Sequence, residues 1–222
     1  MISARALGVD VAGITINRYC ASGLESIAMA TAKIRSGMAD CIIAGGTESM
    51  SLVPTAGWKT VPSYEIAKND PDYYLSMGLT AEAVAKEYNI SRADQDAFAF
   101  ASHQKAMVAQ QENHFKPGIL PITVEEVYVN EKGKKATRSY VVDSDDGVRA
   151  DTSIEALAKL KPAFAVDGTV TAGNSSQTSD GASFVMVLGE KRVQSLGLKP
   201  IARLVNCASA GVHPRIMGIG PV

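Results

Sequence analysis

Apolar runs and small-residue runs alternate over the first part of the chain. Val9 to Ile16 has the apolar character of a strand, whereas Ala21 to Ile34 consists mainly of good helix formers. Gly37 is placed to end this helix, because glycine tolerates the left-handed backbone that follows many helices. Asp40 to Gly46 has the pattern of a short buried strand. The order strand, helix, strand is typical of a parallel sheet, and the sparse charge of the helix predicts that it is buried.

The pattern changes between Thr47 and about Asp167, where prolines and aromatic residues become frequent. Ser91 and Asp94 resemble a capping box, which marks the start of a helix. The elements predicted for this region are helices over 81–88 and 91–113, a hairpin over 124–129 and 139–142, and a short helix over 154–160. The region is therefore expected to be an inserted lid of mixed α and β structure.

Buried-strand patterns return in the last part of the chain. Thr169 to Ser179 is a polar loop rich in serine, threonine and glycine, and it leads into the apolar run Gly181 to Leu188. A short helix over 191–196 and a strand over 201–208 follow. These elements predict an α/β fold whose core is interrupted by the lid.

Composition narrows the class of protein. The 222 residues carry a formal net charge of -1 and are 46% hydrophobic, which is enough to bury a substantial core. The 22 basic and 23 acidic residues are interspersed, so charge gives no reason to expect a nucleic acid as partner. No apolar stretch is long enough for a membrane span, and residues 1–11 lack the pattern of a secretory signal. An intracellular location is the default expectation.

The chain has three cysteines: Cys20, Cys41 and Cys207. An odd number without a Cys-x-x-Cys spacing argues against a disulfide framework and a zinc site, so we expect reduced thiols and no bound metal. Cys41 and Cys207 lie in apolar runs and are expected in the core. Cys20 precedes the first helix, where free backbone N–H groups favour a thiolate, so it is a nucleophile candidate. The alternative for Cys20 is a small buried residue at a helix start.

Four motifs resemble those of a known family. The segments NRYCASGL (17–24) and GGTESM (45–50) look like the thiolases, and VTAGNSSQTSDGA (170–182) with MGIGP (217–221) looks like their degradative 3-ketoacyl-CoA branch. The resemblance implies an α/β fold with a thiolase-like mixed-sheet core and an inserted α+β loop domain that covers coenzyme A. The implied domains are core residues 1–46, the loop domain 47–167, returning core 168–200, and the start of a C-terminal half at 201–222.

The resemblance also implies a reaction. Thiolases cleave 3-ketoacyl-CoA with coenzyme A, or run the reverse condensation, through an acyl-cysteine that would form on Cys20. Coenzyme A is a substrate here, and no resident cofactor or metal is expected. The implied contacts to coenzyme A or acyl-CoA are Met77, Arg149, Leu160, Ala163, Phe164, Ala172 and Ser176. The family further implies a homodimer or homotetramer, located in the cytoplasm or in an organellar matrix.

Three motifs of the family are absent from the 222 residues. These are an Asn in Asn-Glu-Ala-Phe, a His in Gly-His-Pro-x-Gly, and a second Cys in Cys-x-Gly-x-Gly. The pair His213-Pro214 lacks the flanking glycines of the second motif. The resemblance therefore implies roughly half of a subunit, without its acid/base groups, and we expect these residues alone to be inactive.

Other functions stay open at this point. A ketoacyl synthase shares the nucleophilic cysteine, but its cysteine motif differs from the one in this chain. A non-catalytic acyl-CoA-binding protein, or a vestigial truncated thiolase, would fit intact contact residues without the acid/base groups. A hydrolase is the weakest alternative, because the chain has no Gly-x-Ser-x-Gly motif. Ser76, where short-chain biosynthetic relatives carry His, favours the degradative branch.

Overall fold

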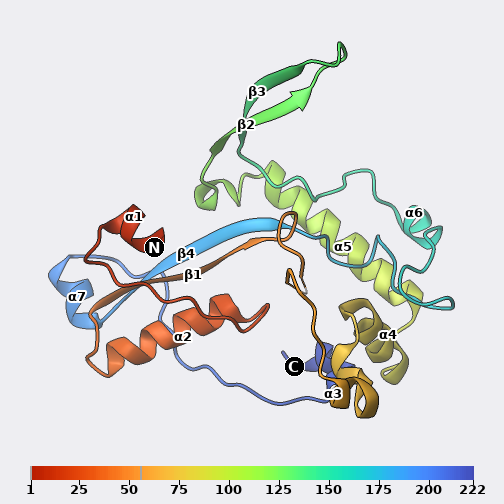
Figure 1. Ribbon diagram of the computed structural model, residues 1–222, viewed down its shortest axis with the longest axis horizontal. Coiled ribbons are helices and arrows are strands. Elements are labelled where there is room, and N and C mark those ends of the chain that lie inside the picture. The colour runs from red at the N-terminus through yellow and green to blue at the C-terminus, as the bar shows by residue number, and fades with distance from the viewer. Residues whose placement is uncertain (1, 56) are drawn as a thin grey trace. The chain divides into compact units, whose positions relative to one another are not determined.

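A computed structural model describes residues 2–55 and 57–222 of the chain (Figure 1). The chain divides into two compact units, and each is described by itself. The first consists of Met1–Val61 and Thr178–Ala210, and the second consists of Pro62–Gln177 and Gly211–Val222. The domain boundaries expected from the resemblance stay a prediction, but an α/β chain is confirmed.

Helix α2 and two strands make up the centre of the first unit. The elements of this unit are α1 (Ile2–Leu7), α2 (Ser22–Arg35), β1 (Cys41–Ser49), β4 (Asp180–Leu188) and α7 (Glu190–Ser195). Helix α2 ends as predicted, because Gly37 has a φ of 75° and its N–H donates to the carbonyl of Ile34. The N–H of Met38 donates to the carbonyl of Lys33, which completes a Schellman motif.

Strands β1 and β4 pair in antiparallel fashion, from Cys41 opposite Leu188 to Ser49 opposite Asp180. The prediction of a parallel strand–helix–strand unit at the start of the chain is therefore wrong. Helix α2 packs against β1, where Ala30 of the helix and Ala44 of the strand are both buried. The hydroxyl of Ser26 adds a hydrogen bond of 3.2 Å to the carbonyl of Gly45. Small residues thus let the helix approach the strand closely.

Two predicted strands are not formed. Residues 9–16 and 201–208 form neither a helix nor a strand. Each segment begins with a turn or a bend and then has no regular structure. Val9 and Ile201 have exposed fractions of 87% and 105%. A strand needs a neighbour for its backbone N–H and C=O groups, and the described sheet in this unit contains only β1 and β4. Both segments are apolar as predicted, but the described residues offer no strand to pair with them.

Burial in this unit is lower than the sequence predicts. Of the described residues of α2, only Ala30 is fully buried, so the prediction of a buried helix is wrong. Cys41 and Cys207 are exposed, and their predicted place in the core is also wrong. A two-stranded sheet covered by a helix on one face leaves its other residues in contact with solvent.

The second unit contains most of the helices. Its elements are α3 (Tyr64–Asn69), η1 (Pro71–Tyr74), α4 (Met77–Glu87), α5 (Arg92–Gln111), η2 (Lys116–Gly118), β2 (Ile122–Val129), β3 (Lys135–Val142), α6 (Ile154–Ala158) and η3 (Pro214–Ile219). The predicted capping box of α5 is confirmed. The hydroxyl of Ser91 accepts from the N–H of Asp94 at 3.1 Å, and the Asp94 carboxylate accepts from the N–H of Ser91 at 3.2 Å.

Strands β2 and β3 form the predicted hairpin, which extends away from α5 (Figure 1). The turn is closed by Asn130, whose side-chain oxygen accepts from the N–H groups of Lys132 and Lys134, both at 3.0 Å. On one face, Arg138 pairs with Glu126 at 2.7 Å and lies over the ring of Tyr128. The hydrogen bond and the charge of Glu126 raise the pKa of Arg138 above its usual value.

No helix in the described part of the chain combines the length and the apolar character that a membrane span requires.

A side-chain clasp joins β1 to β4 at the end of the pair where Ser49 lies opposite Asp180. The carboxylate of Asp180 accepts from the backbone N–H of Ser51 at 2.9 Å and from the hydroxyl of the same residue. These bonds, the hydroxyl first, hold the pKa of Asp180 below its usual value. The clasp therefore stabilises the fold only while the carboxylate is charged.

We predict that Asp180→Asn lowers the Tm of the first unit at pH 7, and that Ser51→Ala does the same. Because the folded pKa is lowered, the stabilisation is complete above the unfolded value of about 3.9 and is lost as the pH falls through the folded value. Thermal unfolding between pH 7 and pH 2 should therefore show the difference from the wild type shrinking in acid. The double variant should lose little more than either single variant, and a pH-independent difference would contradict this account.

Candidate active site

Cys20 lies in a tight turn immediately before α2. Tyr19 has a φ of 48°, which is uncommon for a residue with a side chain. Asn17 supports the turn, since its side-chain oxygen accepts from the N–H of Tyr19 at 2.8 Å. The hydroxyl of Ser22 accepts from the N–H of Arg18 at 2.8 Å and donates to the carbonyl of Tyr19 at 2.7 Å. These bonds fix the backbone on both sides of an exposed thiol.

The start of α2 suits a developing negative charge near Cys20. Ala21 occupies the N-cap position and has no side-chain oxygen to cap the helix. The N–H of Ser22 donates to the carbonyl of Tyr19, whereas those of Gly23 and Leu24 have no acceptor among the described residues. The positive end of the helix dipole acts in the same direction. Arg18 is held beside the turn by an ion pair of 2.5 Å with Glu25. The arrangement can stabilise an oxyanion that forms next to Cys20.

Phe164 packs against the start of α4, at the glycine that follows Met77. Met77 begins α4, and the next residue, Gly78, is buried. A Cβ atom added at Gly78 would lie 2.2 Å from the ring of Phe164, so the ring rests on the bare backbone of the helix. Both side chains keep solvent-exposed surface, with exposed fractions of 57% for Met77 and 44% for Phe164. They form one apolar wall of the second unit.

The segments 160–164 and 170–172 lie side by side. Pro162 and Thr171 form an isolated antiparallel bridge, and the N–H of Ala163 donates to the carbonyl of Val170 at 2.9 Å. The structure thereby places Leu160 and Ala163 on one segment next to Ala172 on the other. All three retain exposed surface. Four other residues make polar contacts in this region and were not predicted from the sequence: Glu82, Arg92, Asp96 and Asn174.

Arg149 and Ser176 are exposed residues of loops in the same unit. The backbone N–H of Arg149 donates to Nδ1 of His103 at 3.3 Å, which ties the loop to α5. The guanidinium lies 3.8 Å from Asp151, and both side chains are largely exposed. An exposed pair of this kind contributes little to stability, so the guanidinium is available to a phosphate. All the predicted contact residues thus belong to the second unit, whereas Cys20 belongs to the first.

A metal site and a cofactor pocket are the other kinds of site that these residues could form. Within residues 2–55 and 57–222, no group of three potential metal ligands comes together. An open cavity of about 390 Å³ lies at the end of α5, where Asn113, Lys116 and Asp143 are among its lining residues. None of the predicted contact residues lines this cavity. Its lining mixes apolar and charged residues and is open to solvent, unlike the mostly apolar pockets that hold cofactors.

We predict that Gly78→Ala displaces the ring of Phe164 and destabilises the second unit by about 1–3 kcal/mol, as overpacking usually does. Gly23→Ala is the matched control, because Gly23 is also the second residue of its helix and a Cβ there meets no atom within 4 Å. The control should be neutral or slightly stabilising. Urea unfolding followed by circular dichroism measures both, and equal effects would contradict the close packing of Phe164 on α4.

Comparisons with known proteins agree with this architecture. A family model described as "Thiolase, N-terminal domain" matches residues 2–191. The chain is 52% identical over 216 residues to the 3-ketoacyl-CoA thiolase of Bacillus subtilis, with 97% of the chain and 55% of the relative covered. It is 44% identical over 208 residues to the peroxisomal 3-ketoacyl-CoA thiolase of Homo sapiens, with 93% and 48% covered.

A solved structure has the same fold. The dimeric peroxisomal thiolase of Saccharomyces cerevisiae matches with a TM-score of 0.81 and 37% identity, over 94% of this chain and 51% of that one. The chain spans about half the length of the curated relatives it matches. The fold-class prediction is confirmed by this likeness. By the match to residues 2–191, the chain belongs to the thiolase family.

Proposed function

We propose that the chain supplies the acyl-accepting cysteine and the coenzyme A contacts of an acyl-CoA C-acyltransferase of the thiolase type. The observation that carries the proposal is the position of Cys20, held in a fixed turn at the N-terminus of α2 within the motif NRYCASGL. Exposure alone does not single it out, because Cys41 and Cys207 are also exposed. Cys20 differs from the other two cysteines in its fixed turn and in the helix terminus that follows it.

The proposed reaction is an acyl transfer in two steps. The thiolate of Cys20 attacks the C3 carbonyl of a 3-ketoacyl-CoA, and the bond between C2 and C3 then breaks. The electron pair leaves with C2 as the enolate of acetyl-CoA, which takes up a proton. Coenzyme A then displaces the acyl group from Cys20 as a shortened acyl-CoA. Groups that move the protons are not assigned to any of the 222 residues, so turnover by the chain alone is not expected.

The binding part of the proposal rests on the exposed side chains of the second unit. Met77, Phe164 and Leu160 would line the apolar part of the ligand, Arg149 would meet a phosphate or the adenine, and Ser176 would hydrogen-bond the pantetheine amide. Arg149 supports this role because its only ion-pair partner in the described residues is a distant, exposed carboxylate. Coenzyme A is a substrate in this scheme, and we propose no other cofactor.

The assembly and the preferred substrate are part of the same proposal. One relative is a dimeric thiolase by its name, and others are named 3-ketoacyl-CoA thiolase or acetyl-CoA acetyltransferase. We propose that the protein works as a homo-oligomer on 3-ketoacyl-CoA, with the broader chain-length range of the degradative branch that Ser76 favours. A cytoplasmic location remains our prediction.

We predict that coenzyme A binds to the chain and that Arg149→Gln weakens this binding, by about tenfold if a phosphate contact is lost. Isothermal titration with coenzyme A and with dephospho-coenzyme A separates the two possible roles. If Arg149 meets the 3′-phosphate, the substitution should affect coenzyme A far more than the dephospho form. Equal losses would place the guanidinium against another part of the ligand, and unchanged affinity for both would contradict the role.

We predict that incubation with acetoacetyl-CoA places an acyl thioester on Cys20 and not on Cys41 or Cys207. The half-reaction can accumulate product slowly even where turnover is absent, because the acyl-enzyme has no fast route to hydrolysis. Peptide mass spectrometry locates the label, and Cys20→Ala should remove it while leaving the fold intact. Label spread evenly over the three exposed thiols would show unselective exchange and contradict a nucleophilic role.

A further inference from the structure

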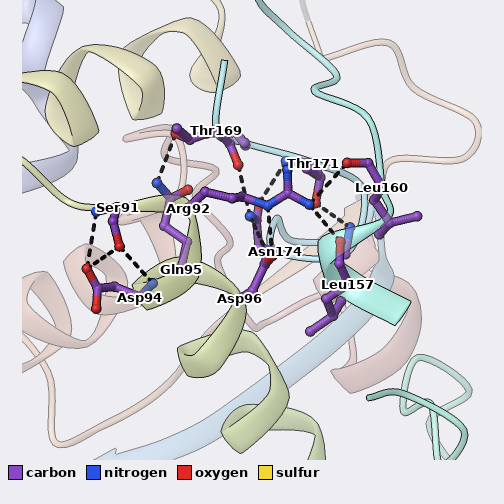
Figure 2. A network of polar contacts seen from close by, with 12 residues as sticks. Ser91, Arg92, Asp94, Gln95, Asp96, Leu157, Leu160, Thr169, Thr171 and Asn174 are labelled. Atoms are coloured by element: carbon purple, nitrogen blue, oxygen red, sulfur yellow. Dashed lines mark hydrogen bonds and ion pairs between the residues drawn. The ribbon is translucent and has the colours of Figure 1, made fainter. Parts of the chain in front are cut away.

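A network of buried and half-buried polar groups in the second unit connects α5 to both segments that carry predicted ligand contacts (Figure 2). Arg92 and Asp96 lie four residues apart on α5, and their side chains meet at 2.8 Å. The carboxylate of Asp96 is almost completely buried, with a side-chain exposed fraction of 4%. A buried carboxylate is stable only when its oxygens are paired, so the groups around Asp96 are held in fixed places.

Arg92 connects the network to the end of α6. Its Nη2 atom donates to the carbonyl of Leu157 at 2.6 Å and to the carbonyl of Leu160 at 3.1 Å. These carbonyls lie at the negative end of a short helix, where a cation is favourable. The guanidinium therefore fixes the backbone at Leu160, which is the first residue of the segment 160–164.

Asn174 connects the same carboxylate to the second segment. Its side-chain amide donates to the free oxygen of Asp96 at 2.9 Å and to the carbonyl of Thr169 at 3.0 Å. Its oxygen accepts from the N–H of Thr171 at 2.7 Å. Thr171 is fully buried, with an exposed fraction of 0%, and its carbonyl accepts from the hydroxyl of Ser175 at 2.7 Å. The side-chain amide of Asn174 thus fixes the backbone of the segment 171–175.

We infer that Arg92, Asp96 and Asn174 are positioning residues for coenzyme A binding, because together they hold the backbone of the segments 160–164 and 172–176 in place. The inference deepens the proposed function and rests on it, since it assumes that these two segments contact the ligand. One oxygen of Asp96 holds Arg92 and the other holds Asn174, so the carboxylate links the two segments in addition to the backbone bond between Ala163 and Val170.

The fold has separate supports that do not pass through Asp96. Glu82 of α4 accepts from the N–H groups of Thr169 and Val170, at 2.9 and 2.8 Å, which anchors the start of the loop. The capping box at Ser91 holds the start of α5. Loss of the Asp96 contacts should therefore loosen the two segments without unfolding the unit.

The test compares Asp96→Asn and Arg92→Lys with Ser91→Ala in the full chain. Lysine keeps the charge of Arg92 but cannot reach a carboxylate and two carbonyls at once. Ser91→Ala removes the capping hydroxyl one residue away and lowers the Tm without touching the network, so it controls for general destabilisation. Titration with coenzyme A should show a dissociation constant raised roughly tenfold for both network variants and unchanged for the control.

Hydrogen exchange gives a readout that does not depend on the ligand. Amides of residues 159–176 should exchange faster in both network variants, while those in the middle of α5 stay protected. Faster exchange with unchanged affinity would overturn the inference and leave the proposed function standing. If the wild-type chain does not bind coenzyme A, the proposed function fails and the inference with it. Unchanged exchange in both variants would also overturn the inference.

Exchanging the side chains of Asp96 and Asn174 tests the contact between them directly. Asn174→Asp alone places a second carboxylate against Asp96, and we expect the weakest coenzyme A binding of the set. Adding Asp96→Asn restores one carboxylate and one amide in contact, so the double variant should bind several-fold more tightly than Asn174→Asp alone. If the double variant is weaker than both single variants, the contact between positions 96 and 174 does not set the ligand site. Should Asp96→Asn fail to fold, Arg92→Lys, whose side chain is a quarter exposed, decides the question.

Discussion

The pairing of one buried carboxylate constrains two ligand-contact segments of the second unit. Asp96 is 3% exposed, and its two oxygens take different partners, Arg92 and Asn174. An uncompensated charge at this depth would cost several kcal/mol, so the partners cannot move away independently. Because one partner holds the backbone at Leu160 and the other holds Thr171, a loop with little regular structure acquires a defined shape.

The turn at Cys20 is fixed by a different kind of interaction. Its hydrogen bonds join residues at most four positions apart, through the side chains of Asn17 and Ser22. Such a turn depends on the local sequence and on the helix that follows it, whereas the ligand-contact segments depend on groups far apart in the chain. The nucleophile is therefore the more robust part of the proposed site, and the binding segments are the part most sensitive to distant substitutions.

Local signals in the sequence predicted the elements that are stabilised locally. The capping box at Ser91, the glycine after α2 and the hairpin of β2 and β3 are all confirmed. The strands expected over 9–16 and 201–208 are not formed, because a strand depends on a neighbour that no local pattern reveals. Arg92 and Asp96 have the spacing of an ordinary surface ion pair, so the sequence could not predict that the carboxylate of Asp96 is buried. The predicted ligand contacts came from a family resemblance, and no pattern of burial would have found them.

We propose that Met77, Arg149 and the segments 160–164 and 172–176 form one binding surface for coenzyme A. A titration of the isotope-labelled chain with coenzyme A, followed by amide chemical shifts, tests it most directly. The account predicts that resonances of these residues shift together along one saturable curve, while those lining the open cavity at Asn113 stay in place. Saturable shifts confined to that cavity, or no saturable shifts at all, would contradict it.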